Sequence, residues 1–335
     1  MRRRDFISLL GSAAIAGSLA AAAQQSTNRK RLAIFSPSEP SADLHEHSES
    51  KFSRALFAEL RRLGQIEGQN LKVERYGREQ NTSGPEALAA EIVRSNPDVI
   101  WIVGPGAVIF KKLTSRIPLV AITGDPVKQG IAESLAHPGG NFTGVSVDAG
   151  QTIYGKRIAL LREMFPTMSK LGCLILRLQW DGPITGPAIR AAAETTGLPL
   201  AVSLLEMGTS EAGYRAAVES ISRDGAQAVM VVESPELFQN AALIAKLVGA
   251  AKLPAIFTHP EAVESGGLMA YSFDLIELYK RAANTIDAIL RGANPGDIPI
   301  YQVTKYELSI NLKVAKQLGL SVPPALVAIA DMVIE

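Results

Sequence analysis

Short apolar runs that alternate with longer amphipathic segments constrain this chain more than any other feature. The runs are rich in Ile, Val and Leu and lack polar alternation, a pattern typical of parallel strands covered on both faces. They are Arg31–Phe35, Asp98–Val103, Leu119–Ile122, Leu171–Leu176, Gln227–Val232 and Pro254–Phe257. We therefore expect each run to be a buried strand.

The segments between these runs carry apolar residues at helical spacing. Phe52, Leu56 and Leu60 share one face of a helix expected within 48–64. Similar stripes mark 85–95, a helix through Leu237, Ala241, Ile244 and Val248, and a helix over 275–290. Such stripes are typical of helices that cover a sheet. Strand–helix alternation predicts an α/β fold with doubly wound parallel sheets.

The alternation falls into two blocks, from about residue 29 to 145 and from about 150 to 265. Each block supplies enough strands for its own sheet, so the length suits two domains. The turn-rich segment 136–148 suits a crossing between them, and a further strand, helices and an extended segment follow residue 265. Several crossings make a multi-strand hinge. The expected domains are lobe 1, 29–145 plus 270–298, and lobe 2, 146–269 plus 299–335.

The first 25 residues have the layout of a secretory signal. Three arginines precede an apolar run of small residues, and Ala21–Ala23 offers a cleavage site before Gln24. The segment Arg3–Ile7 also fits a twin-arginine export pattern. A membrane anchor is disfavoured, because a spanning helix needs about 20 strongly apolar residues. We expect residues 1–25 to be removed and the protein to be exported.

Charge and cysteine content argue against nucleic-acid binding and against a reactive thiol. Without residues 1–25, the chain has 31 basic residues of the original 34 and 32 acidic residues of the original 33. A near-neutral chain without a basic stretch interleaved with aromatics is not expected to bind nucleic acid. The single cysteine, Cys173, lies in a predicted strand, where an inert, packed thiol is favoured.

Ligands of doubly wound sheets bind beyond the carboxyl ends of the strands. Residues 104–106 precede a helix expected from Ala107, where free N–H groups suit a carboxylate, although the turn alone explains such a sequence. The acidic residues of this set suit an ammonium group or are solvated surface. Trp180 suits a stacking lid or a packing role. The candidate ligand-binding residues are Ser36, Pro37, Ser38, Gly104, Pro105, Gly106, Gly124, Asp125, Trp180, Asp181, Glu233, Ser234, His259, Glu261 and Tyr271.

Catalytic and cofactor motifs are not found in the sequence. His45-Glu46-His47 lacks HExxH spacing, and Ile109 breaks the GxGxxG dinucleotide pattern at 104–109. No GxSxG elbow, Walker loop or CxxC occurs. We therefore predict no catalytic residue, no metal and no cofactor. A secreted α/β enzyme with a cryptic site at the same strand ends is the alternative from a different class.

Several longer segments resemble a known family. They are Phe52–Asn70 (FSRALFAELRRLGQIEGQN), Leu135–Gly144 (LAHPGGNFTG), Gly155–Leu161 (GKRIALL), Ala262–Tyr271 (AVESGGLMAY) and Thr304–Leu320 (TKYELSINLKVAKQLGL). They are similar to segments of ABC importer substrate-binding proteins of the tryptophan and tyrosine type. The chain departs from that family at Arg177–Trp180, where an Asn-Pro pair is usual, and at Glu233–Pro235.

The resemblance implies a type I periplasmic-binding-protein fold with two lobes and three crossings. It further implies a monomeric periplasmic protein without enzymatic activity. Such a protein binds a small polar or amino-acid-like molecule in the cleft between its lobes and docks on an ABC permease in the inner membrane. A ligand-binding sensor that docks on a receptor has the same fold and stays open as an alternative.

Overall fold

The computed structural model describes residues 29–37, 39–104, 106–147 and 152–335. The chain divides into two compact units, and each is described by itself. Unit 1 contains the described residues up to Ser146 and Leu275–Tyr301, whereas unit 2 contains the described residues of Val147–Asp274 and Gln302–Glu335. The expected lobes had slightly different bounds: residues 270–274 belong to unit 2, and residues 146 and 299–301 belong to unit 1. The predicted signal peptide, 1–25, lies outside the described residues.

Unit 1 is built on a sheet with the strand order β11-β5-β4-β3-β1-β2 in the described part of the chain. The pairs β1–β2, β1–β3, β3–β4 and β4–β5 are all parallel. The predicted runs at 31–35, 98–103 and 119–122 are confirmed as strands of this sheet. Its strands are β1 (Lys30–Phe35), β2 (Leu71–Tyr76), β3 (Val99–Val103), β4 (Leu119–Thr123), β5 (Phe142–Ser146) and β11 (Tyr301–Gln302).

The second half of the expected crossing segment 136–148 is β5, a strand of unit 1. Its Gly144 has φ +144, and a Cβ there would lie 2.1 Å from the carbonyl oxygen of Ala121 on β4. Only glycine fits so close to the neighbouring strand. The turn residues that precede it, including Gly139 and Gly140 with positive φ, lead into this strand. The chain leaves unit 1 only after Ser146.

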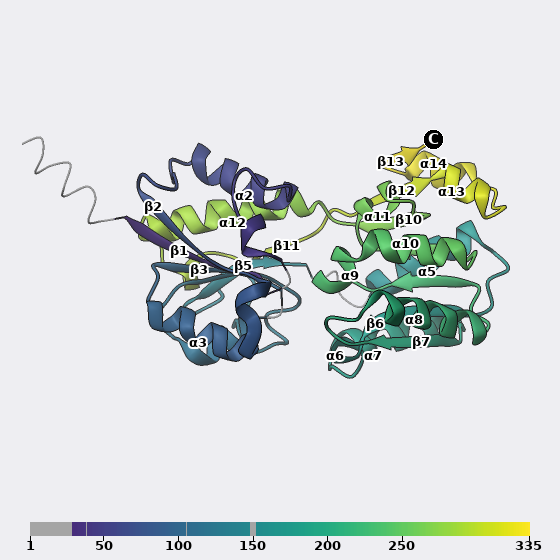
Figure 1. The fold of residues 1–335 in the computed structure, drawn as a ribbon, viewed down its shortest axis with the longest axis horizontal. Helices are drawn as coiled ribbons and strands as arrows, with labels where there is room; N and C mark the ends of the chain where they lie inside the picture. Colours follow the sequence, from purple (N-terminus) through teal and green to yellow (C-terminus); the bar gives the residue numbers. More distant parts are fainter. Residues whose placement is uncertain (1–28, 38, 105, 148–151) are drawn as a thin grey trace, which may run out of the picture. The chain divides into compact units, whose positions relative to one another are not determined.

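Helices cover both faces of this sheet (Figure 1). Phe35 and Ile102 pack on one face with Leu88, Ile92 and Phe110 of α3 and α4. Trp101 points to the other face, because side chains alternate along a strand, and its ring meets Tyr279 of α12. On that face α2 lies against α12. The helices of unit 1 are α2 (Lys51–Arg62), α3 (Pro85–Ser95), α4 (Ala107–Leu113) and α12 (Leu275–Leu290), with short 3-10 turns η1 (Ser41–Asp43), η2 (Arg78–Ser83) and η3 (Pro295–Asp297).

Unit 2 has the strand order β13-β12-β10-β9-β8-β6-β7 within the described residues. The five strands β6 to β10 run parallel, β12 is antiparallel to β10, and β13 is parallel to β12. The runs predicted at 171–176, 227–232 and 254–257 are confirmed as strands. The strands are β6 (Leu171–Leu176), β7 (Leu200–Leu205), β8 (Ala228–Val231), β9 (Ala255–Phe257), β10 (Met269–Ser272), β12 (Glu307–Asn311) and β13 (Met332–Ile334).

Two apolar clusters lie on the two faces of this second sheet. One gathers α5 and α7 residues around Cys173 and Ile175, and the other gathers α8 and α10 residues around Leu174 and Leu176. Burial raises the pKa of the Cys173 thiol to about 12, so this thiol stays protonated. The helices of unit 2 are α5 (Thr152–Met164), α6 (Arg177–Trp180), α7 (Thr185–Thr196), α8 (Glu211–Arg223), α9 (Pro235–Gln239), α10 (Ala241–Ala250), α11 (Pro260–Glu264), α13 (Leu312–Gln317) and α14 (Pro324–Ile329).

The predicted helix through Leu237 and Val248 is two helices rather than one. α9 begins at the cap residue Ser234, whose Oγ accepts a hydrogen bond from Leu237 N at 3.0 Å. Asn240, with φ −97 and ψ 12, separates α9 from α10. The apolar spacing runs across this break because both helices bury residues in the same cluster.

The two sheets share one connectivity. Five strands of each unit follow the order second, first, third, fourth, fifth: β2-β1-β3-β4-β5 in unit 1 and β7-β6-β8-β9-β10 in unit 2. Successive strands are added first on one side of β1 and then on its other side, from β3 onward, and the same change of side occurs at β6. Such switch points leave a crevice at the carboxyl ends of the strands, where ligands of doubly wound sheets bind.

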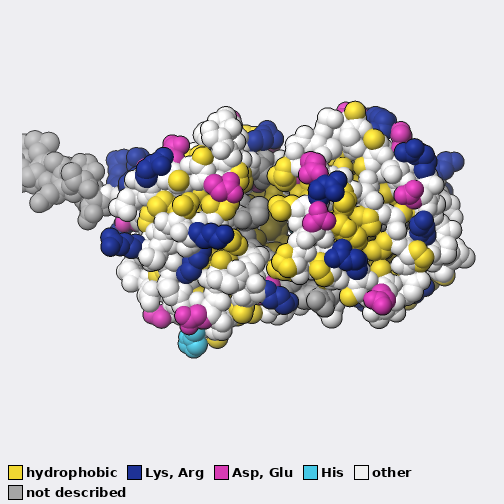
Figure 2. Space-filling view, turned by 90° about the horizontal axis from the view of Figure 1, so that it is seen from below, with side chains coloured by type: hydrophobic (Ala, Val, Ile, Leu, Met, Phe, Trp, Pro, Cys, Tyr) yellow, Lys and Arg dark blue, Asp and Glu magenta, His cyan; other side chains and the backbone are white. Residues whose placement is uncertain are grey.

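The described surface carries both signs of charge, and Figure 2 shows acidic and basic side chains interspersed on the face in view. The formal net charge of the whole chain is +1. Among the described helices, none is long and apolar enough to cross a membrane. No group of three or more His, Cys, Asp or Glu side chains in that same part of the chain is arranged to hold a metal ion.

Candidate functional site

The first switch point, in unit 1, begins with the loop after β1. Ser36 is fully buried, and its backbone N–H donates to the carbonyl of Tyr76 at 3.0 Å. Its hydroxyl donates to Oε2 of Glu39 at 3.3 Å. Pro37, which follows Ser36 in the sequence, is partly buried. Ser38 lies outside the described residues. The loop therefore places a hydroxyl and a carboxylate at the carboxyl end of β1.

On the β3 side of this switch point, glycine is required for packing. Gly104 has φ +90, and Pro105 lies outside the described residues. Gly106 starts α4, and a Cβ on it would lie 2.5 Å from a ring carbon of Phe35. Gly106 thus lets the start of α4 approach the end of β1. A carboxylate site at its amides stays a prediction.

In the loop after β4, the carboxylate of Asp125 accepts hydrogen bonds from the loop's own backbone. Asp125, which follows Gly124, accepts hydrogen bonds on Oδ1 from the N–H groups of Val127 and Lys128, each at 3.0 Å. Its other oxygen lies 3.2 Å from Lys128 Nζ. Burial raises the pKa of Asp125, but these donors together hold it below its ordinary value. This carboxylate is already neutralised by its own loop.

In unit 2 the loop after β6 is the short helix α6. The Trp180 ring is partly buried against the core, and the Arg190 guanidinium lies over it with Cζ 4.7 Å from the ring centroid. Trp180 therefore has a packing role, and one of its faces carries a cation. Asp181 follows it, exposed to solvent, and its N–H donates to Arg177 O at 2.9 Å.

The loop after β8 contains an ion pair on Glu233. Oε1 accepts a hydrogen bond from the Tyr154 hydroxyl, and Oε2 lies against Arg157, both at 2.5 Å. The Arg157 side chain is 2% exposed and that of Glu233 29%. Burial raises the pKa of Glu233, but Arg157 and Tyr154 outweigh it and hold the pKa below its ordinary value. Glu233 is therefore ionised, with one donor on each oxygen.

Two further hydrogen bonds connect this loop to its neighbours. Gln179 Nε2 donates to the backbone oxygen of Glu233 at 2.6 Å, which joins the loops after β6 and β8 across the second switch point. Arg157 also donates from Nε and NH2 to the carbonyl of Tyr271 on β10, at 3.4 and 3.3 Å. Ser234 caps α9, so its hydroxyl has a structural role.

Aromatic rings collect at the carboxyl ends of β9 and β10. The buried His259 meets Phe238 and Phe273 edge-on, with centroids 4.8 and 5.6 Å apart, and its Nδ1 lies 3.4 Å from the Ser272 hydroxyl. The Tyr271 ring stacks on Tyr306 at 5.5 Å. Glu261 is partly buried in the first turn of α11. Strand ends of unit 2 thus combine flat ring surfaces with hydrogen-bonding groups.

Sequence reasoning missed four residues at these strand ends: Glu39, Tyr154, Arg157 and Gln179. Tyr154 and Arg157 lie at i and i+3 of α5 and both face the sheet, a position that an arginine rarely occupies unless paired. The resemblance segment at 155–161 includes Arg157 but gives it no role. Nothing in the sequence around Glu39 distinguishes it from a solvated loop residue.

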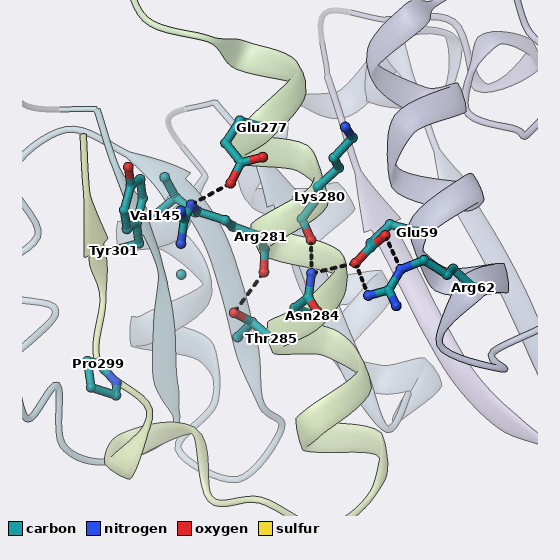
Figure 3. Close-up of a pocket in the computed structure, with 11 residues that line it drawn as sticks. Glu59, Arg62, Val145, Glu277, Lys280, Arg281, Asn284, Thr285, Pro299 and Tyr301 are labelled. Carbon is teal, nitrogen blue, oxygen red and sulfur yellow. Dashed lines mark hydrogen bonds and ion pairs between the residues drawn. The ribbon is translucent and has the colours of Figure 1, made fainter. Parts of the chain in front are cut away.

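Unit 1 also has a charged groove of about 510 Å³ beside α2 and α12. Figure 3 shows that its two arginines pair with carboxylates within the groove. Glu59 accepts from Arg62 at 2.7 Å and from Asn284 at 2.8 Å, and Arg281 lies 3.0 Å from Glu277. None of the sequence-predicted site residues lines it. Its arginines are already neutralised, which is typical of a solvated surface groove.

Two doubly wound α/β units with the same strand order, linked by three chain crossings, define a type I periplasmic-binding-protein fold. The model of the family described as ABC transporter substrate binding protein matches residues 45–334. The chain belongs to that family, so the resemblance seen in the sequence is confirmed.

Known proteins similar to this chain agree with the assignment. A tyrosine-binding protein of Clostridioides difficile is 25% identical over 285 residues, which cover 83% of this chain and 80% of that protein. Two solved structures have the same fold, each with a TM-score of 0.78 and 91% of this chain covered. One, a conserved domain protein from Vibrio cholerae, is 22% identical and 99% covered; the other, an ABC domain in complex with L-Trp from Streptococcus pneumoniae, is 21% identical and 100% covered.

Proposed function

We propose that this chain is the exported solute-binding component of an ABC importer, that it binds a small polar or amino-acid-like molecule, and that it catalyses no reaction. The observation that carries the proposal is the family match, which extends over residues 45–334 and so includes both units. The binding of a solute, rather than its conversion, is what the family name describes.

The geometry of each unit supports the proposal. Both sheets have a switch point, and at both of them polar groups follow the strands: Ser36 and Glu39 in unit 1, Gln179 and Glu233 in unit 2. Loops placed by rigid strands are the usual location of binding residues. We propose that ligand-binding residues lie at these strand ends. Residues 104–106 and Tyr271 belong to that proposed set.

The relatives favour an amino acid as the ligand. The similar protein from C. difficile is named as tyrosine-binding, and the similar domain from S. pneumoniae was solved with L-Trp. The rings of Tyr271, Phe273 and Tyr306 offer apolar faces of the kind that bind an aromatic or aliphatic side chain. Because Arg177–Trp180 departs from the family sequence, the proposal includes amino acids other than these two.

Location and partner follow from the same proposal. An importer takes its solute from outside the cytoplasm, which agrees with the secretory layout of residues 1–25. We propose export to the periplasm with removal of this segment, and docking of the monomeric protein on an inner-membrane ABC permease.

A thermal-shift screen tests the proposal. Protein refolded to remove co-purified ligand is heated with each of the twenty amino acids, small carboxylates, nucleosides and sugars. A ligand that binds only the folded protein adds about 2.7 kcal/mol of stability at 100 times its Kd, so the melting temperature should rise by a few degrees. If no compound shifts the melting temperature, solute binding is contradicted; if mass spectrometry finds the bound compound converted, an enzyme is indicated.

A further inference from the structure

The acidic side chains predicted to receive a ligand's ammonium group differ in what already surrounds them. Asp125 is neutralised by Lys128 and two backbone N–H groups, and Glu233 by Arg157 and Tyr154. Asp181 is exposed, where water screens its charge. Glu261 lies in the first turn of α11, where the free N–H groups of the helix already stabilise a carboxylate. A carboxylate that is already paired gains little from a second cation. A strong ammonium site therefore calls for a carboxylate that is sheltered from water and has no cation of its own.

Glu39 meets this description. It lies in the loop after β1, at the switch point of unit 1, and it is partly buried. Its carboxylate accepts a hydrogen bond from the Ser36 hydroxyl at 3.3 Å, and no ion pair joins it to a lysine, arginine or histidine of the described residues. The negative charge of Asp43, in η1, repels the Glu39 carboxylate. The Glu39 charge in turn adds to burial in raising the pKa of the Tyr279 phenol, in α12.

The backbone around Glu39 holds it in this unfavourable environment. Its N–H donates to Ser36 O at 3.2 Å, and its carbonyl accepts from Arg78 N at 2.7 Å. Gly77 packs so closely that a Cβ there would lie 2.7 Å from the Glu39 carbonyl oxygen. The loop is therefore fixed on both sides. A sheltered carboxylate without a cation costs folding free energy, and such arrangements concentrate at functional sites.

We propose that Glu39 binds the ammonium group of the ligand, with the Ser36 hydroxyl orienting its carboxylate, so that the ligand is an amino acid or another primary ammonium compound. The inference rests on the proposed solute-binding function. The ligand's cation would supply the charge that the described residues do not. Glu233, by contrast, is a positioning residue that Arg157 and Tyr154 hold in place.

A dependence of affinity on pH follows. Burial, opposed by the Ser36 hydrogen bond and reinforced by Asp43, raises the pKa of Glu39 above its ordinary value of 4.5. A neutral carboxyl group attracts an ammonium ion weakly. Affinity should therefore fall as the pH drops through the raised pKa. Among the described residues, the groups that interact with this carboxyl are the Ser36 hydroxyl, the Asp43 carboxylate and the Tyr279 phenol.

The experiment measures Kd by calorimetry for each of the twenty L-amino acids and, for each that binds, for the matching acid without the ammonium group. The variants are Glu39→Gln and, as matched control, Glu49→Gln, an exposed acid of the same loop region. We expect Glu39→Gln to weaken amino-acid binding about 10- to 100-fold, the loss of one charge-assisted hydrogen bond, and Glu49→Gln to change it less than about 2-fold. The acids without ammonium should bind wild type no better than they bind Glu39→Gln.

The stability of ligand-free Glu39→Gln separates binding from a structural role. A carboxylate kept for the fold would lower the melting temperature when lost, whereas one kept for a ligand should leave it unchanged or raise it. Unchanged amino-acid affinity in Glu39→Gln, or equal binding of the acids without ammonium, overturns the inference and leaves solute binding intact. If no amino acid binds but a sugar or nucleoside does, the inference is likewise overturned. If nothing binds, both proposals fail.

Discussion

Buried charges in unit 2 are tolerated because they compensate one another. Arg157 is 2% exposed, yet it meets the Glu233 carboxylate at 2.5 Å and the carbonyl of Tyr271. The sequence identified Glu233 as a strand-end acid but not its partners, because α5 has too little amphipathic contrast to show which arginine points inward. The pairing depends on how α5 lies on the sheet. Apolar periodicity alone does not carry that information.

Arg157→Met should destabilise the protein by about 3 kcal/mol, because it leaves the Glu233 carboxylate without its cation in a sheltered place. Adding Glu233→Gln to this variant should restore at least about 1 kcal/mol, since the unpaired charge is then removed. Urea unfolding followed by circular dichroism measures both differences. A double variant as unstable as Arg157→Met alone would show that the ion pair is not the cause.

At the scale of elements, the sequence predicted the central strands well and their surroundings less well. Runs such as Leu171–Leu176 are apolar throughout because both faces are covered, which made them visible. The edge strands β2 and β7 went unpredicted, because polar residues interrupt the apolar run in both strands: charged residues in β2 and Ser203 in β7. The break at Asn240 was also missed, since a helix cap can interrupt an apolar stripe without changing its spacing.

The contact between α6 and α7 gives a prediction about glycine. A Cβ on Gly186 would lie 1.9 Å from the Trp180 carbonyl oxygen, so Gly186→Ala must push the two helices apart and should cost about 2–3 kcal/mol. Gly155→Ala, on α5 with nothing within 4 Å of the added methyl, should instead stabilise by about 0.5–1 kcal/mol. Thermal unfolding compares the two; equal effects would contradict the packing argument.

The stabilisation that Glu59 of α2 provides through its hydrogen bonds with Arg62 and with Asn284 of α12 should depend on pH. The hydrogen bond from Arg62, with that from Asn284 and against burial, lowers the pKa of Glu59 from 4.5 to about 2. A carboxyl pKa lowered by folding stabilises the folded state above the unfolded pKa. That contribution disappears as the pH falls from 4.5 towards 2.

Wild type should therefore be more stable than Glu59→Gln at pH 7, and the difference should shrink below pH 4.5. Urea midpoints at pH 7, 4 and 2.5 provide the measurement. A difference that does not change with pH would mean that Glu59 acts through packing rather than through its charge.

At the scale of the whole molecule, the strand–helix alternation predicted two α/β units, and the resemblance of several segments predicted the family. The fold and the family match confirm both. The candidate site was predicted only as a set of loops after strands. Residues such as Ser36 and Gly106 fall there because connectivity fixes where strands end. The charge state of each acid could not be predicted, because it depends on partners distant in sequence, as Glu233 and Arg157 are separated by 76 residues.

The three crossings at 146–147, 274–275 and 301–302 mean that neither unit is one continuous stretch of polypeptide. A chimera that exchanges one half with a homologue would need three splice junctions, because any single cut leaves α12 or β12 with the wrong partner. Simple truncation would likewise deprive one sheet of a strand or one core of a helix. Engineers who wish to change the cargo of this protein should therefore replace individual loops and keep the scaffold whole.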